Sequence, residues 1–152
     1  MVVQFLVGSI ANVINIMIHA LVTVGAIGIA RSAGLRKTNR QRLRLMAVMV
    51  CTAAVLMLAH TLEVFVWALI YAAVGAAPAG SDLLYLAFVN YTTLGYGDVT
   101  PVKAWQLTGP MTAMNGILMF GWSTAVLFEV LRKTLEYFAS TGKSGFSYSD
   151  RG

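Results

Sequence analysis

The stretch from Asn90 to Pro101 reads NYTTLGYGDVTP, and its meaning decides how the whole chain is interpreted. Gly95 and Gly97 alternate with Leu94 and Tyr96 in the middle of a strongly apolar sequence. Irregular backbone is unfavourable in apolar surroundings, because its amide groups lose water without gaining regular partners. The residues on either side of the stretch must therefore explain why it is there.

The composition is that of a membrane protein. Of the 152 residues, 58% are hydrophobic and 11% are charged, whereas soluble domains carry about 25% charged residues. So few charges do not cover a water-facing surface, and the mean hydropathy is +0.73. The length leaves room for a few spans of ~20 residues each, and we expect one domain without a separate ligand-binding domain.

The distribution of charge indicates a membrane topology and argues against nucleic acid as a partner. The net charge is +5, and six of the eleven basic residues lie in one segment between two apolar runs: Arg31, Arg36, Lys37, Arg40, Arg42 and Arg44. This pattern is typical of a cytoplasmic loop. The same segment, Arg31–Arg44, is suited to contact anionic lipid headgroups.

Three apolar runs are long enough to cross a bilayer as helices. The first lacks the basic start of a signal peptide, so we expect a retained span. Basic residues after the third run predict a cytoplasmic C-terminus, and three spans then put the N-terminus outside. Trp67 and Tyr71, near the far end of the second run, are expected at the membrane interface. The runs cover about residues 2–30, 45–77 and 105–131.

Between the second and third runs lies a segment with helical character that is too short to cross. Ser81–Thr92 reads SDLLYLAFVNYT, with Ser81 or Asp82 as the helix N-cap. At ~1.5 Å per residue it reaches only ~18 Å, against a hydrocarbon core of ~30 Å. We therefore expect it to enter from outside, stop partway and return as TLGYGD. Such backbone survives at membrane depth only where protein buries it or where it lines a water-filled cavity.

This order of helix, half-length helix, T-x-G-Y-G-D and helix resembles the pore module of the potassium channel family, whose filter reads T-V-G-Y-G. The resemblance covers about residues 45–131, and the first span is extra compared with the simplest two-span members. The third span, which contains NGILMFGWSTAVLFEV, is similar to that of small bacterial potassium-channel-like proteins with three predicted spans. It implies an all-α integral membrane fold: three transmembrane helices, a re-entrant pore helix and a selectivity-filter loop per subunit. It also implies a homotetramer in a bacterial inner or plasma membrane.

The resemblance implies that K⁺ is bound by rings of backbone carbonyls from Thr93, Leu94, Gly95, Tyr96 and Gly97. Aiming successive carbonyls at one axis requires backbone angles that glycine tolerates, which explains the two glycines. One loop supplies a quarter of each ring, so we expect four copies. K⁺ is the only bound metal expected, without an organic cofactor. We find no catalytic motif and expect no enzyme activity.

The residues expected to support the filter depart from the commonest family pattern. Leu94 replaces valine, and Tyr85 stands where many members carry tryptophan, so we expect a Tyr85–Asp98 hydrogen bond in place of the usual contact. Val89 stands where some members carry glutamate, and a weaker polar brace would soften the discrimination between K⁺ and Na⁺. The expected supporting residues are Thr92, Asp98, Tyr85 and Val89.

Among the polar residues inside the first two runs, five fall into two groups. Asn12, Asn15 and His19 share one helical face, and His60 and Glu63 share another. They form a polar seam that holds the two spans together, or a gate that senses pH or a ligand. A proton pathway is a third alternative.

The third run carries glycines and polar residues in mid-span. Gly116 and Gly121 are candidate gating hinges, with Gly116 preferred, and close helix packing is the alternative. Asn115, Met119 and Ser123 follow at helical spacing and either line the cavity or form a packed face.

The sequence thus predicts an extra first helix with its basic loop over 1–44, a pore module over 45–136 and a disordered cytoplasmic tail over 137–152. The predicted function is a passive K⁺-selective channel. The alternatives are a weakly selective monovalent cation channel, or a non-conducting regulatory membrane subunit.

Overall fold

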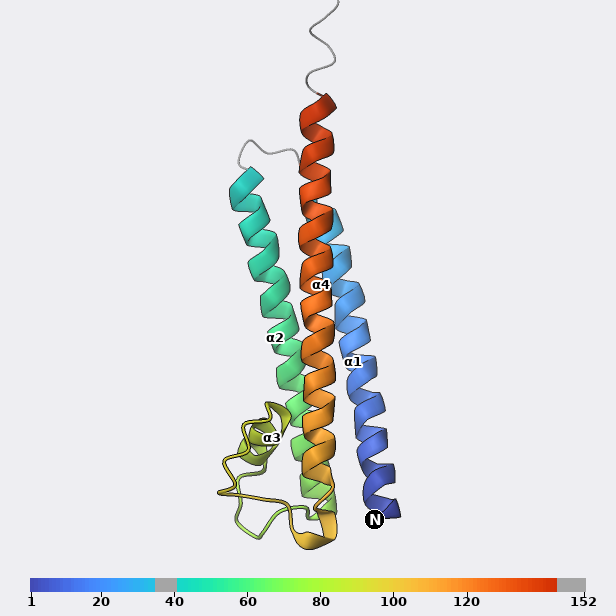
Figure 1. The fold of residues 1–152 in the computed structure, drawn as a ribbon, viewed down its shortest axis with the longest axis vertical. Helices are drawn as coiled ribbons and strands as arrows, with labels where there is room; N and C mark the ends of the chain where they lie inside the picture. Colours follow the sequence, from blue (N-terminus) through green and yellow to red (C-terminus); the bar gives the residue numbers. More distant parts are fainter. Residues whose placement is uncertain (35–40, 145–152) are drawn as a thin grey trace, which may run out of the picture.

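The computed structural model describes residues 1–34 and 41–144, and these parts are helical with connecting turns and loops (Figure 1). Three helices are long and apolar enough to cross a membrane, over Val2–Gly28, Leu43–Val74 and Thr108–Tyr137, which confirms the three predicted spans. The elements in chain order are α1 (Val2–Gly34), α2 (Gln41–Val74), α3 (Leu83–Tyr91), the short 3₁₀ helix η1 (Lys103–Trp105) and α4 (Thr108–Ser144).

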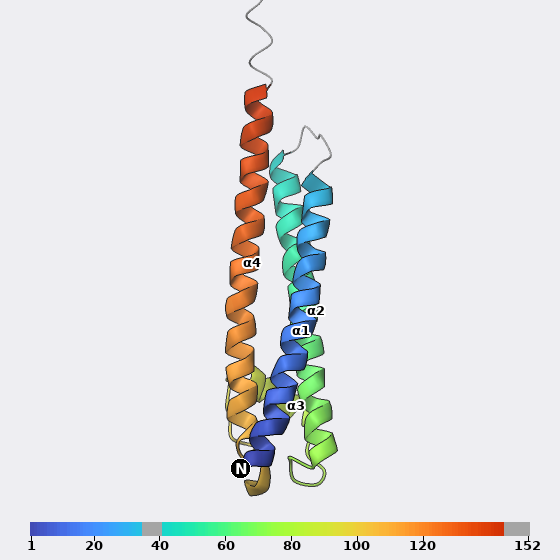
Figure 2. The same cartoon turned by 90° about the vertical axis from the view of Figure 1, so that its right-hand side faces the viewer.

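The three long helices lie side by side, with α2 running opposite to α1 and α4 (Figures 1 and 2). The short helix α3 lies at the end of the bundle that carries the N-terminus. It packs against α2 and α4, while α1 packs against α2 and α4. The loop after α3 is therefore held at one end of the bundle.

Local sequence signals set the ends of α2 and α3. Gly75 has φ +63°, and the N–H groups of Gly75 and Ala76 bond to the carbonyls of Ala72 and Tyr71. This is the Schellman arrangement that glycine favours after a helix. Asp82 caps α3, because its side chain accepts the Tyr85 N–H at 3.0 Å. The sequence predicted Ser81 or Asp82 as the N-cap, and the structure shows that it is Asp82.

Trp67 and Tyr71 are fully buried in the core of the chain, and their predicted depth at the membrane interface stays a prediction. Their polar atoms find partners inside the chain. Trp67 Nε1 donates to Asn115 Oδ1 at 3.1 Å, and the Tyr71 hydroxyl bonds to Thr112 Oγ1 at 2.6 Å. These aromatic side chains join α2 to α4.

Helix α4 continues to Ser144, so residues 137–144, predicted to belong to a disordered tail, are helical. Arg132 pairs with Glu129 and Glu136, and Lys133 pairs with Glu129, at spacings of three and four residues. Such pairs support a helix beyond its apolar stretch. Arg36, Lys37, Arg40 and the segment 145–152 lie outside the described residues, as do the side chains of 29–42, so the predicted lipid contact stays a prediction.

Candidate functional site

The loop from Thr92 to Val102 leaves α3 through a compact set of backbone hydrogen bonds. Thr92 N bonds to Phe88 O at 2.9 Å, Thr93 N to Asn90 O at 3.0 Å and Leu94 N to Val89 O at 3.0 Å. The Thr92 hydroxyl also donates to Phe88 O at 2.7 Å. The first residues of the loop are therefore fixed to the last turn of the short helix.

Every second residue from Thr93 to Gly97 has left-handed backbone. The φ angles are +60° at Thr93, +59° at Gly95 and +76° at Gly97, while Leu94 and Tyr96 between them do not have positive φ. Glycine adopts this conformation without strain, as expected for Gly95 and Gly97. Thr93 does so against its preference, a sign of a backbone conformation held by its surroundings.

The side chains of the same loop are not covered by their own chain. Leu94 is 54% exposed and Tyr96 is 67% exposed, although both are large and partly or wholly apolar. Beside the loop lies an open groove of about 500 Å³ between α3, the loop and the start of α4, lined in part by Val89, Asn90, Thr93 and Pro110.

The loop ends in a hydrogen bond that the sequence predicted. Tyr85 Oη donates to Asp98 Oδ2 at 2.7 Å, and Asp98 Oδ1 accepts its neighbour's N–H, from Val99, at 2.9 Å. The Tyr85 hydroxyl holds the pKa of Asp98 below its ordinary value, and the nearby carboxylate raises the pKa of Tyr85. The bond ties the end of the loop to the first turn of α3.

Gly116 lies where α4 meets the end of α3. A Cβ atom built on Gly116 would stand 1.9 Å from the carbonyl oxygen of Tyr91 and 2.9 Å from its carbonyl carbon. This contact explains the glycine by close packing, which was the alternative to a hinge. Gly121 is different, because nothing lies within 4 Å of a Cβ at that position and the residue is exposed.

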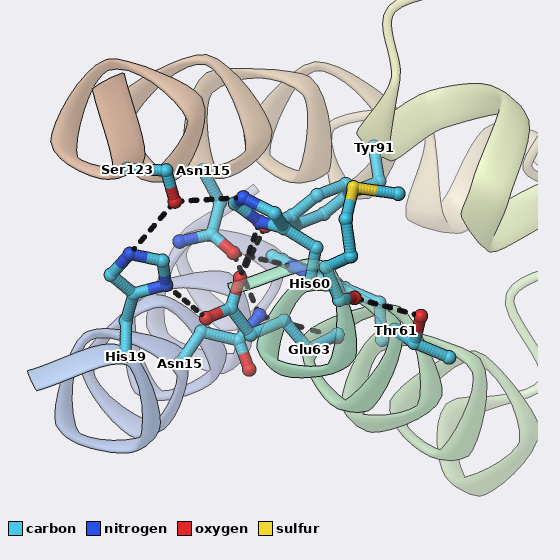
Figure 3. Close-up of polar contacts among 10 residues, drawn as sticks. Asn15, His19, His60, Thr61, Glu63, Tyr91, Asn115 and Ser123 are labelled. Carbon is cyan, nitrogen blue, oxygen red and sulfur yellow. Dashed lines mark hydrogen bonds and ion pairs between the residues drawn. The ribbon is translucent and has the colours of Figure 1, made fainter. Parts of the chain in front are cut away.

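Five buried side chains form a closed ring of hydrogen bonds that joins α1, α2, α3 and α4 (Figure 3). His19 Nδ1 lies 2.7 Å from Glu63 Oε1, and the Tyr91 hydroxyl donates to Glu63 Oε2. His60 Nδ1 lies 3.0 Å from Tyr91 Oη. Ser123 Oγ closes the ring, 2.9 Å from His60 Nε2 and 3.3 Å from His19 Nε2. Tyr91, the last residue of α3, thus bonds directly to two residues of α2 and is linked through them to α1 and α4.

Counting protons shows that a fully bonded ring is electrically neutral. Five bonds require five protons, and the hydroxyls of Ser123 and Tyr91 supply two of them. The two histidines and Glu63 supply the other three only if their charges sum to zero. With Tyr91 donating to Glu63, the hydrogen bond between His19 Nδ1 and Glu63 Oε1 shares one proton between these two groups. A neutral group of this kind is the form that burial tolerates best.

The polar seam predicted between the first two spans also reaches further than expected. Asn15 Nδ2 donates to Asn115 Oδ1 at 2.7 Å and approaches Glu63 O at 3.3 Å. Among the described residues, the buried Oδ1 atoms of Asn12 and Asn15 have no hydrogen-bond partner.

The residues of α4 predicted either to line a cavity or to form a packed face do the latter. Asn115, Met119 and Ser123 are 2%, 0% and 7% exposed within the single chain. Their positions are filled by contacts with α1 and α2, so the cavity-lining interpretation was wrong.

Two residues of the site had not been identified from the sequence. Tyr91 lies within Asn90–Pro101, four residues before Gly95, but no role in the site was assigned to it from the sequence. Gln4 hydrogen-bonds Ala104 O through Nε2 and accepts Leu107 N at 3.2 Å through Oε1. A lone glutamine in an apolar run was the only available signal for that contact.

A family model described as "Ion channel" matches residues 45–133, which is more than half of the chain and spans α2, α3 and most of α4. Helix α1 lies outside the match. No curated protein and no solved structure matches the chain. With three helices able to cross a membrane, the match indicates a membrane protein.

Proposed function

Because the chain belongs to the ion channel family, we propose that it forms a passive K⁺-selective pore in which Thr93 to Gly97 are the selectivity filter. The observation that carries this proposal is the alternation of left-handed backbone at residues 93, 95 and 97, directly after a half-length helix. When neighbouring residues have mirror-image conformations, successive carbonyls turn toward the same side. A line of such oxygens can replace the hydration shell of K⁺.

The length of α3 supports a re-entrant arrangement. Leu83–Tyr91 has 9 residues, which span only ~14 Å at ~1.5 Å each, against a hydrocarbon core of ~30 Å. The chain then returns to the end of the bundle from which α3 started. In this arrangement the C-terminal end of the helix dipole points into the membrane, where it favours a cation.

The proposed assembly is a homotetramer. One loop supplies one side of an ion path, and a closed ring of carbonyls needs several copies around an axis. The exposure of Leu94 and Tyr96 in the single chain agrees with this, because neighbouring copies would cover them. We place the N-terminus outside and the basic segment at Arg31–Arg44 in the cytoplasm of a bacterial inner or plasma membrane.

A second candidate, a weakly selective monovalent cation channel, is favoured by one observation. Val89, behind the filter, is 4% exposed and offers no hydrogen bond from its side chain to the loop. The Tyr85–Asp98 bond braces the outer end of the loop, while the backbone bonds of Leu94 and Thr93 hold the inner end. A filter whose middle residues are not fixed by hydrogen bonds would discriminate less sharply between K⁺ and Na⁺.

Flux through purified protein in liposomes tests both candidates. We expect K⁺ flux that largely excludes Na⁺, and equal K⁺ and Na⁺ fluxes would establish the weakly selective channel instead. Gly95→Ala is the matched control, because a side chain at φ +59° is strained and should abolish flux. A stable assembly of the natural chain that passes neither ion would reject both candidates.

A further inference from the structure

We propose that His19, His60 and Glu63 form a binding site for a divalent transition metal of the Zn²⁺ type, separate from the K⁺ path. One ligand atom of each residue lies within 4.8 Å of the other two, and all three residues are buried. The ligands come from α1 and α2, so the site lies inside one chain. It requires neither conduction nor assembly into a tetramer.

The carboxylate of Glu63 lies between the two histidines, with one oxygen toward each Nδ1 atom. A tetrahedral Zn²⁺ with bonds of ~2.0–2.2 Å to nitrogen and oxygen holds its ligand atoms about 3.3–3.5 Å apart. His60 Nδ1 lies 3.4 Å from Glu63 Oε2, and His19 Nδ1 lies 2.7 Å from Glu63 Oε1. Small side-chain shifts would make room for an ion. Three protein ligands leave the fourth position of a tetrahedral ion for water.

The donor set selects the class of metal. Two imidazoles and one carboxylate are a common ligand set of zinc sites, and imidazole suits Zn²⁺, Cu²⁺, Ni²⁺ and Co²⁺. K⁺, which we assign to carbonyl oxygens, has no preference for such nitrogens. The site is therefore chemically distinct from the proposed filter.

Ser123 supplies the outer contact that metal-binding histidines require. A ligating histidine normally donates its other ring N–H to a nearby oxygen. Here the Nε2 atoms of His19 and His60 both face Ser123 Oγ, at 3.3 and 2.9 Å, and this oxygen has two lone pairs to accept both. Ser123 can turn its own hydroxyl proton toward the carbonyl one helical turn back, as serine in helices does.

Metal binding would replace the hydrogen bonds that His19 and His60 make through Nδ1 in the ring. The ion would then join the same helices through stronger bonds. Because Tyr91 directly precedes the loop, metal binding would fix the inner end of the loop and raise the thermal stability of the chain.

The test is a titration of chelator-treated, tag-free full-length protein in detergent with Co²⁺, whose visible absorption reports tetrahedral nitrogen and oxygen ligands. We expect one Co²⁺ per chain with a dissociation constant well below ~1 mM, and a higher unfolding temperature. Ser123→Ala keeps all three ligands and should bind 10- to 100-fold more weakly. His19→Gln and Glu63→Gln should lose the absorption.

Cys51→Ser is the matched control, because Cys51 is an exposed free cysteine and thiolates also bind these metals. It should leave the titration unchanged. The proposal is overturned if folded natural protein shows no saturable Co²⁺ absorption. That result would mean that hydrogen bonds alone hold the ring together. It is also overturned if the absorption survives in His19→Gln or disappears in Cys51→Ser. Ion flux does not enter any of these outcomes.

Discussion

At the scale of single residues, Gly116 of α4 packs directly against the backbone of Tyr91. Gly116→Ala would place a methyl group 1.9 Å from a backbone oxygen of Tyr91, and a backbone atom does not move aside as a flexible side chain does. We expect a loss of about 1–3 kcal/mol in the free energy of unfolding, measured as a lower unfolding temperature in detergent.

Gly121→Ala is the matched comparison, because it meets nothing within 4 Å. In this exposed helical position alanine should stabilise the chain by roughly 0.5–1 kcal/mol. The two variants should thus change stability in opposite directions. If Gly116→Ala were as stable as the natural chain and lost only gating, the hinge interpretation would stand after all.

The Tyr85–Asp98 hydrogen bond gives a second prediction at this scale, and it depends on pH. Because the pKa of Asp98 is lowered in the folded state, the bond stabilises the loop above the ordinary aspartate pKa. That contribution is lost as pH falls through the lowered value. Tyr85→Phe should therefore be less stable than the natural chain at neutral pH, and the difference should disappear in acid.

Unfolding temperatures measured from neutral pH down to pH 3 check this sign. Asp98→Asn is the control, because it should remove the acid-dependent part of the difference. A Tyr85→Phe variant whose deficit grew as the pH fell would contradict the assignment.

At the scale of elements, the start of α3 depends on one capping side chain. Asp82→Ala removes the acceptor of the Tyr85 N–H and should cost about 0.5–2 kcal/mol of stability. Ser81→Ala, at the other candidate cap, should change stability by less than about 0.5 kcal/mol. Unfolding temperatures of the two variants separate the positions, and equal losses would refute the assigned cap.

Helix α1 contacts the segment after the loop through Gln4. Gln4→Ala would leave Ala104 O and Leu107 N without this partner, at a cost of about 1–3 kcal/mol where such groups are buried. We expect faster amide hydrogen exchange at residue 107, with α2 unchanged as the internal reference. Unchanged exchange there would show that α1 does not support this segment.

The helices were easier to predict from the sequence than the identity of their buried side chains. The three spans, the short helix and its cap followed from apolar length and from Asp82, because these signals are local. The burial of Trp67 and Met119 did not follow, because in a membrane both lipid-facing and buried positions are apolar and periodicity does not separate them. The ring through Tyr91 and Ser123 depends on contacts between distant segments, and a single sequence does not display those.

At the scale of the whole molecule, the proposed assembly predicts that K⁺ stabilises it. Binding to the folded state raises stability by about 2.7 kcal/mol at a concentration 100 times the dissociation constant. The tetramer should therefore dissociate at a higher temperature in K⁺ than in Na⁺ at equal ionic strength. Gly95→Ala should remove this difference, and a natural chain equally stable in both ions would count against selective binding.

The closed ring also has a consequence for how the protein is made. His19 and Ser123 are 104 residues apart in sequence, so the ring closes only after synthesis has passed α4. Until then His60, which bonds to Tyr91, lacks its own contact with Ser123, and the start of the loop is less firmly fixed. Helix α4, which supplies Ser123, thus completes the hydrogen-bonded ring. A chain terminated before Ser123 would present a loop without this support to the membrane's proteases.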